Sequence, residues 1–162
     1  MIARFEQLAR DKSGAAVVEL ALAAPILAMM VIGVTDISMA YGKKLELEQA
    51  AQRAIEKVMQ TTGENTPEDT IKKEAVCQFN GTNADGSCKT APLTTANVVV
   101  TYNLTCDGTV TAYSSDCTGT QTEVRYITAT ATYIYTPHFD LRFGTQPDGK
   151  YHLDGSAAVR VQ

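Results

Sequence analysis

The strongest pattern in the chain is a long apolar run near its N-terminus. Residues 15–34 contain a single charge, Glu19, and residues 37–41 can extend the run. A helix that crosses a bilayer needs about 20 mostly apolar residues. The pattern therefore predicts a transmembrane segment over residues 15–37.

The helix continues beyond this run with a different pattern. After Lys43 and Lys44, apolar residues recur at helical spacing, at Leu45, Ala50 or Ala51, Ala54, Ile55 and Val58. Gly63 and Pro67 in "TTGENTPED" then end the helix. The sequence thus predicts one helix over residues 15–62, membrane-spanning in its first half and amphipathic in its second. At ~1.5 Å per residue it is about 70 Å long.

The second half of the chain has the pattern of β-strands. From Asn97 onward, "NVVVTYNLTC", "TEVRYITATATYIYT" and "GSAAVRVQ" are rich in residues that suit a pleated surface. In the middle segment, Ile127, Ala129 and Ala131 share one face with Tyr135, while Thr and Ile134 alternate with them on the other. We expect three or four antiparallel strands. The predicted fold is α+β, a long N-terminal helix followed by a small antiparallel β domain over residues 63–162.

Charge sets the expected orientation of the helix. Arg4, Arg10 and Lys12 precede the apolar run, so the positive-inside rule predicts a cytoplasmic N-terminus and an exported C-terminal domain. A cleavable secretory signal is the alternative, but its apolar region is roughly 7–15 residues and ends at a small-residue cleavage site. Here the run is longer and no clean site follows it, which favours a retained helix.

Composition narrows the classes of partner and chemistry. The 162-residue chain has a net charge of −4 and no basic stripe, which argues against nucleic acid as its main partner. His138 and His152 have no Glu or Cys around them at metal-ligand spacing, so they are interpreted as solvated loop histidines. No nucleophile elbow or phosphate loop occurs either. We predict no catalytic residue, no metal site and no cofactor.

Four cysteines lie in the part predicted to be exported. An even number in such a domain favours disulfides. Three connectivities are possible, and we favour Cys77–Cys88 with Cys106–Cys117, because each pair encloses ten residues that contain turn formers. A zinc site is the alternative, but zinc ligands usually come in pairs two to four residues apart. Each such disulfide would stabilise a small domain by about 2–3 kcal/mol.

The glutamate in the apolar run has a specific context. Gly14 precedes it by five residues, with small or apolar residues between them, at the head of a long apolar helix. This is the pattern that prepilin peptidases recognise. The chain resembles the type IV pilin superfamily, and more closely the TadE-like pseudopilins of tight-adherence (Flp) pilus systems. The resemblance rests on "GAAVVELALAAPIL" with Pro25, on "LELEQAAQRAIEKV" and on the terminal "GSAAVRVQ".

The resemblance implies a processing site and an assembly residue. Residues 1–14 would be a leader that a prepilin peptidase removes after Gly14, leaving Ala15 as the new N-terminus. Glu19 would then pair with the free amino group of a neighbouring subunit, since an ionised carboxylate in a membrane costs several kcal/mol without a partner or a proton. The alternative is a Glu19 that is solvated at the headgroup boundary. Leu20 stands where major Flp pilins usually have Tyr, and this domain is larger than theirs, which favours a minor pilin or pseudopilin.

The implied partners are other pilins of the same system, a prepilin peptidase and the inner-membrane assembly platform. The implied location is the bacterial inner membrane with a periplasmic C-terminal domain, or the pilus tip after assembly. Two other functions stay open: an uncleaved single-pass protein with a periplasmic binding or sensing domain, and an exported enzyme that depends on its histidines. Asp36 is interpreted as reaching the outer headgroups or periplasmic water, with an inter-helix contact as the alternative.

Overall fold

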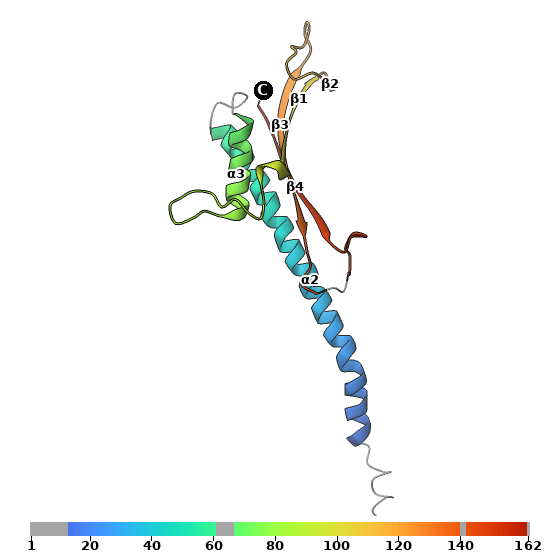
Figure 1. Cartoon of the computed structure of the whole chain (residues 1–162). Helices are drawn as coiled ribbons and strands as arrows, with labels where there is room; N and C mark the ends of the chain where they lie inside the picture. Colours follow the sequence, from blue (N-terminus) through green and yellow to red (C-terminus); the bar gives the residue numbers. More distant parts are fainter. Residues whose placement is uncertain (1–12, 61–66, 140–141, 162) are drawn as a thin grey trace, which may run out of the picture.

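One helix forms the axis of the molecule. In this computed structural model, residues 13–60, 67–139 and 142–161 are described. Helix α2 (Ser13–Gln60) runs unbroken for 48 residues, through Pro25. Its N-terminal half extends away from the rest of the fold, which gathers around its C-terminal half (Figure 1). The predicted long helix is confirmed; residues 61 and 62 of the predicted range lie outside the described residues.

The two halves of α2 differ sharply in burial. The side chains described between residues 16 and 31 are all exposed, although nearly all are apolar; Leu22, for example, is 69% exposed. The first buried positions are Gly33 and Asp36, followed by Ala40 and Leu47. The folded domain therefore covers only the second half of the helix. The first half is long and apolar enough to cross a membrane.

A four-stranded antiparallel sheet packs against this second half. Its strands are β1 (Val98–Cys106), β2 (Thr109–Thr111), β3 (Glu123–Tyr135) and β4 (Tyr151–Arg160), in the order β2-β1-β3-β4. The expected α+β class and the antiparallel strands are confirmed. Strand β4 starts four residues before the predicted "GSAAVRVQ". The predicted faces of β3 are also observed, with Ile127, Ala129 and Ala131 buried and Ile134 exposed.

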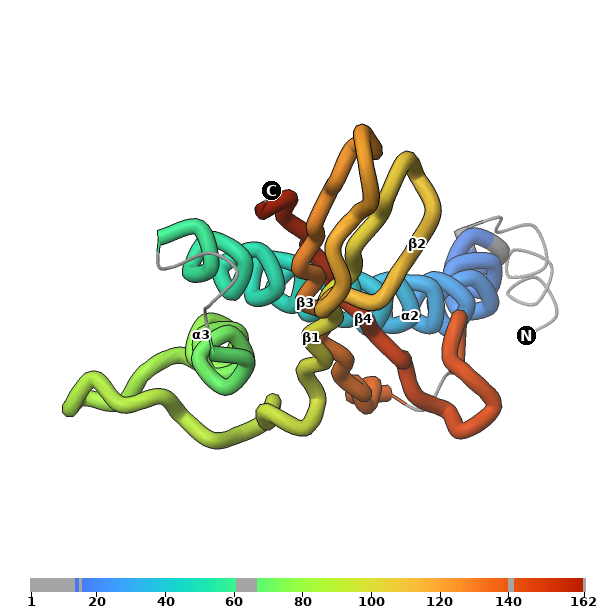
Figure 2. The backbone as a smooth tube through the Cα atoms, turned by 90° about the horizontal axis from the view of Figure 1, so that it is seen from above, coloured from blue at the N-terminus to red at the C-terminus, as the bar shows by residue number. Residues whose placement is uncertain are grey.

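A second helix was not predicted from the sequence. Helix α3 (Glu68–Asn80) packs against the second half of α2 (Figures 1 and 2) and buries Ile71, Ala75 and Val76. It starts directly after Pro67, and its first turn holds two acidic residues that favour a helix N-terminus. The segment after residue 62 is therefore not purely β. A short 3₁₀ turn, η2 (Thr95–Asn97), leads from this region into β1.

The loop between α3 and the sheet is fastened at both ends. Cys77 near the end of α3 is joined to Cys88, with their Cα atoms 4.8 Å apart. The amide of Asn80 donates hydrogen bonds to the carbonyls of Lys89 and Leu93, both at 2.8 Å, and its own oxygen accepts the Leu93 N–H at 2.9 Å. Leu93, fully buried, is thereby held in the core.

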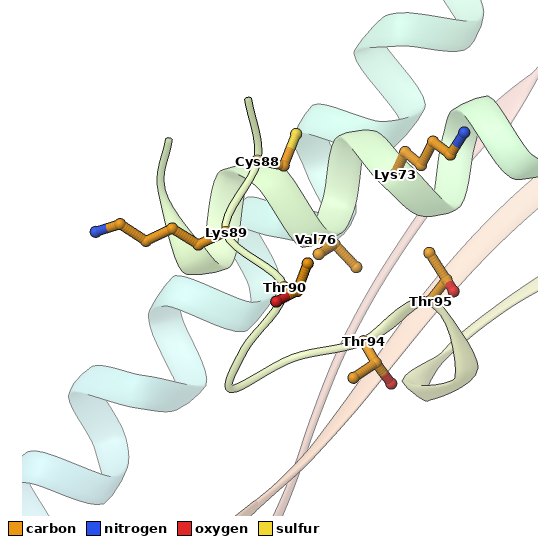
Figure 3. A pocket seen from close by; sticks show the side chains of 7 residues that line it. All are labelled: Lys73, Val76, Cys88, Lys89, Thr90, Thr94 and Thr95. Carbon is orange, nitrogen blue, oxygen red and sulfur yellow. The ribbon is translucent and has the colours of Figure 1, made fainter. Parts of the chain in front are cut away.

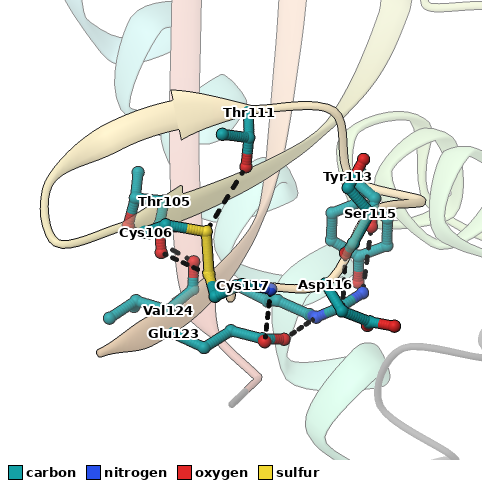
Figure 4. Close-up of polar contacts among 10 residues, drawn as sticks. Thr105, Cys106, Thr111, Tyr113, Ser115, Asp116, Cys117, Glu123 and Val124 are labelled. Carbon is teal, nitrogen blue, oxygen red and sulfur yellow. Dashed lines mark hydrogen bonds and ion pairs between the residues drawn. A yellow bond between two sulfur atoms is a disulfide. The ribbon is translucent and has the colours of Figure 1, made fainter. Parts of the chain in front are cut away.

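The end of the sheet farthest from the N-terminus carries the other cysteine pair. Cys106 in β1 is joined to Cys117 (Figure 4). Both favoured pairings therefore occur in the structure. Arg125 in β3 binds Glu123 at 2.6 Å and Asp116 at 3.0 Å, and also donates to the Tyr113 carbonyl. The Arg125 hydrogen bond lowers the pKa of Glu123 below its ordinary value. The disulfide and the arginine together fasten the distal loop onto the sheet.

The sheet meets α2 through small residues. Gly155 in β4 pairs with Ala131 in β3, and Ala157 pairs with Ala129. They face a helix surface with fully buried Ala50, Ala51 and Ala54. A Cβ atom added at Gly155 would lie 2.6 Å from both the Glu48 nitrogen and the Leu47 carbonyl carbon. Strand β4 thus touches the backbone of α2 directly, and only glycine leaves room for this contact.

We predict that Gly155→Ala loosens the contact between β4 and α2. The added methyl meets backbone atoms that cannot rotate away, so we expect a loss of about 1–3 kcal/mol in the free energy of unfolding. Thermal unfolding of the full chain in detergent checks this. Ala158→Val, at an exposed position on the opposite face of the same strand, is the control and should change stability by less than about 0.5 kcal/mol. Equal melting temperatures for Gly155→Ala and the parent would contradict the prediction.

Candidate functional site

The predicted processing residues lie in the first turns of α2. Gly14 is exposed, and a Cβ added to it would meet no atom within 4 Å. Glycine costs about 1 kcal/mol relative to alanine inside a helix. The described fold therefore gives no packing reason for glycine at this position. Ala15 lies in the same helical turn.

Glu19 is an exposed carboxylate on an otherwise apolar surface. Among the residues that the structure describes, none forms a hydrogen bond or ion pair with it. The next charge along the helix is Asp36, about 26 Å further at ~1.5 Å per residue. As far as the described residues go, Glu19 is thus placed where lipid, solvent or another chain can reach it. The fold keeps it apart from the cysteines and histidines of the β domain.

Asp36 has a different environment from the one expected. It is 3% exposed, and its carboxylate accepts the backbone N–H groups of His138 and Phe139, each at 3.0 Å. The expectation that it reaches headgroups or water is wrong, because the segment that follows β3 covers it. Its contact is also within the chain and not between helices. Sequence reasoning missed these partners because they lie more than a hundred residues downstream.

Aromatic side chains surround this carboxylate. The Tyr135 hydroxyl lies 3.0 Å from Nδ1 of His138. Burial, and then the negative charge of Asp36, raise the pKa of Tyr135 and of Tyr151 above the ordinary value. The Tyr151 hydroxyl donates a hydrogen bond to the Phe143 carbonyl, and the Phe143 ring lies against Gly33. The connection between β3 and β4 is therefore docked on α2 at residues 33–36, where the apolar run ends.

The two histidines do not form a metal or catalytic cluster. Nε2 of His152 lies 2.8 Å from Oδ2 of Asp148, and this hydrogen bond lowers the pKa of Asp148 below its ordinary value. His138 is exposed and contacts Tyr135. Within the described part of the chain, no group of three His, Cys, Asp or Glu side chains is arranged to bind a metal ion.

An open groove of about 410 Å³ lies beside α3. In Figure 3, its two lysines extend in opposite directions and their ammonium groups do not converge. The only sulfur in its lining belongs to the Cys77–Cys88 disulfide. Its lining holds no carboxylate or imidazole and consists of Lys73, Val76, Cys88, Lys89, Thr90, Thr94 and Thr95. The groove thus has no acid–base pair for catalysis.

We predict that Asp36→Ala releases the segment that it holds. Two buried N–H groups lose their acceptor, which should cost about 1–3 kcal/mol of stability. Hydrogen–deuterium exchange of the full chain in detergent should show faster exchange at His138 and Phe139. Asp36→Asn, which keeps one acceptor oxygen, should give a smaller effect. Asp154→Ala, at an exposed position of β4, is the control; equal exchange in the two alanine variants would show that the Asp36 contact contributes nothing.

A comparison with known protein families finds a match, which lies within the N-terminal helix. The family model described as TadE-like protein matches residues 14–55, which cover Gly14, Glu19 and most of α2. No curated protein and no solved structure matches the chain. The matched family is a structural and not an enzymatic one, of pilins of the tight-adherence system. The resemblance predicted from the sequence is thus confirmed over residues 14–55, the part of the chain that matches the TadE-like proteins.

Proposed function

We propose that the protein is a minor pilin or pseudopilin of a tight-adherence pilus, processed after Gly14. One observation carries the proposal: Glu19 stands alone on an exposed apolar half-helix that the folded domain leaves uncovered. An apolar helix of this length is stable in lipid or against other helices, because exposing apolar surface to water costs about 25 cal/mol per Å². Such a helix can span a membrane before assembly and can pack against other helices in a bundle afterwards.

The length of the uncovered segment supports a membrane anchor. From Ala16 to Gly33 the helix rises about 26 Å, close to the ~30 Å thickness of a bilayer's hydrocarbon core. The β domain begins to cover the helix only at Gly33. The basic residues 4, 10 and 12 precede this segment in the sequence and lie outside the described residues; by the positive-inside rule they favour an N-terminus in the cytoplasm and a β domain in the periplasm.

Removal of the leader gives Glu19 its role. The cut after Gly14 creates an amino group at Ala15 and removes the basic residues that hold the N-terminus at the cytoplasmic face. A neighbouring subunit displaced along the helix axis brings its new amino group to Glu19. In lipid, which does not solvate a charge, the ion pair stabilises both charged groups. Because the pair forms at only one axial displacement of the two helices, it selects that register. The β domain, stapled by two disulfides, then faces outward at the tip or in the priming complex.

A second candidate function is an uncleaved single-pass anchor for a periplasmic binding domain. It accounts for the apolar half-helix but gives Gly14 and Glu19 no function. The mature N-terminus separates the two functions, since the anchor keeps residues 1–14.

We predict that the chain from native membranes starts at Ala15. Gly14→Leu should keep the leader, because a bulky side chain next to the scissile bond blocks access of the peptidase. Intact mass and N-terminal sequencing measure the outcome. Gly42→Ala is the control, since Gly42 is also in α2 with no atom within 4 Å of its Cβ position, and it should be processed as the parent is. A native chain that starts at Met1 would favour the uncleaved anchor.

We predict that Glu19→Gln is processed normally but fails to assemble. Losing one charge of an ion pair in lipid should weaken association with other pilins by about tenfold or more, which corresponds to at least ~1.4 kcal/mol. Cross-linking and co-purification from native membranes measure the association. The control is Glu46→Gln, an exposed position in the second half of the same helix. Unchanged cross-linking of processed Glu19→Gln would leave the carboxylate without an assembly role.

A further inference from the structure

We propose that the segment between β3 and β4 rests on the outer surface of the bilayer, with Phe139 and Phe143 in contact with lipid. The inference concerns what the β domain touches, and it rests on the transmembrane part of the proposed function. The segment is described at residues 136–139 and 142–150, and is called the interfacial segment below.

The height of this segment is fixed by its contacts with α2. The Phe143 ring lies 3.1 Å from the position of a Cβ at Gly33, and Asp36 accepts the N–H of Phe139 at 3.0 Å. Gly33 and Asp36 lie about 26 and 30 Å along the helix from Ala16. A hydrocarbon core is about 30 Å thick. If Ala16 is at one boundary of the core, the interfacial segment is therefore at the other.

The two phenylalanines remain exposed despite these contacts. Phe139 is 44% and Phe143 54% exposed. Their backbone positions are held by Asp36 and by the Tyr151 hydroxyl, so the rings are presented by a docked segment of the chain. Apolar rings on the lowest part of a periplasmic domain, next to the end of a membrane span, are at the level where they enter the acyl region.

Nearby residues have the composition of a membrane interface. Tyr41, 61% exposed on α2, adds an amphipathic ring at this level, as in the aromatic belts of membrane proteins. Lys43, Arg142 and Lys150 add basic residues to this region, and the long apolar stems of such side chains suit a membrane interface. The Lys43 ammonium also pairs with Glu46 at 2.6 Å. Two carboxylates described in this region have partners: Asp36 is buried and accepts two backbone N–H groups, and Asp148 in the interfacial segment lies 2.8 Å from Nε2 of His152.

The proposed arrangement also explains how the carboxylate of Asp36 can lie at the edge of the hydrocarbon core. Polar groups at membrane depth must be satisfied within the protein. The N–H groups of His138 and Phe139 satisfy this carboxylate, and the carboxylate in turn satisfies two N–H groups that would otherwise approach lipid unpaired. The hydrogen bonds of Asp36 thus satisfy the buried polar atoms and also hold the backbone that carries the Phe139 ring. The β domain is then held at one height and one orientation above the membrane.

The chain contains no tryptophan, so single tryptophans report on chosen positions. Four full-length variants are reconstituted into phosphatidylcholine–phosphatidylglycerol vesicles. Phe143→Trp and Phe139→Trp are the probes, Leu22→Trp is the reference expected within the acyl region of the bilayer, and Val110→Trp in β2 is the distal control. Fluorescence is measured with and without lipids brominated on their acyl chains, near the headgroup or near the methyl end. Circular dichroism confirms that each variant melts like the parent.

We expect both probes to be quenched by brominated lipid, more strongly when bromine is near the headgroup, and to emit at shorter wavelength than Val110→Trp. Leu22→Trp should be quenched most by deep bromine, and Val110→Trp not at all. Because the two probes are on different residues, misfolding of one leaves the other as the test.

Any of four results would overturn the inference. Probes that emit and resist quenching like Val110→Trp are in water. Blue-shifted but unquenched probes are covered by protein, which would assign the rings to a second copy or another pilin. An unquenched Leu22→Trp shows that α2 does not span the vesicle membrane, and then the transmembrane proposal fails as well. Quenching of Leu22→Trp without quenching of either probe leaves the membrane anchor intact and removes only the interfacial contact.

Discussion

The direct contact between β4 and the backbone of α2 is the constraint on which the rest of the fold depends. Gly155 brings the strand within touching distance of Leu47 and Glu48, and the alanines of β3, β4 and α2 fill the narrow space on either side. A small-residue contact of this kind fixes both the rotation and the axial position of the helix under the sheet. A domain of under a hundred residues has a small core and needs additional stabilisation. The disulfides Cys77–Cys88 and Cys106–Cys117 and the second helix provide it.

Fixing the sheet at residues 47–55 of α2 determines where the domain ends. Strands β3 and β4 run down the helix, and the described part of the segment between them contacts α2 at Asp36 and Gly33. The described side chains from residue 16 to residue 31 are all exposed. The boundary between covered and uncovered helix coincides with the end of the apolar run. Packing and hydropathy, which are independent properties, thus place the change of environment at the same residues.

The sequence predicts those features that depend on local pattern. The apolar run, the helical spacing after Lys44 and the alternation in β3 each follow from periodicity, and all three are observed. Features that depend on distant pairs were missed. The Asp36 contact joins residues 102 positions apart, and the close approach at Gly155 depends on where β4 lies on α2. Helix α3 was missed for another reason: its buried apolar positions 71, 75 and 76 are few, and residues 63–162 were assigned as a whole to the β domain.

The two carboxylates of α2 that lie closest to the apolar run, Glu19 and Asp36, differ in burial, and this difference separates a structural role from an intermolecular one. Both lie on one helix about 26 Å apart, and both are placed where an ionised group is costly in lipid. Asp36 has two backbone donors from its own chain, so its contribution is to the fold. Glu19 has no partner among the described residues. The same physical cost applies to each: Asp36 finds its partner within the chain, and in the proposed function Glu19 finds one in another subunit. This difference, and not the glutamate alone, supports assembly as the role of the N-terminal helix.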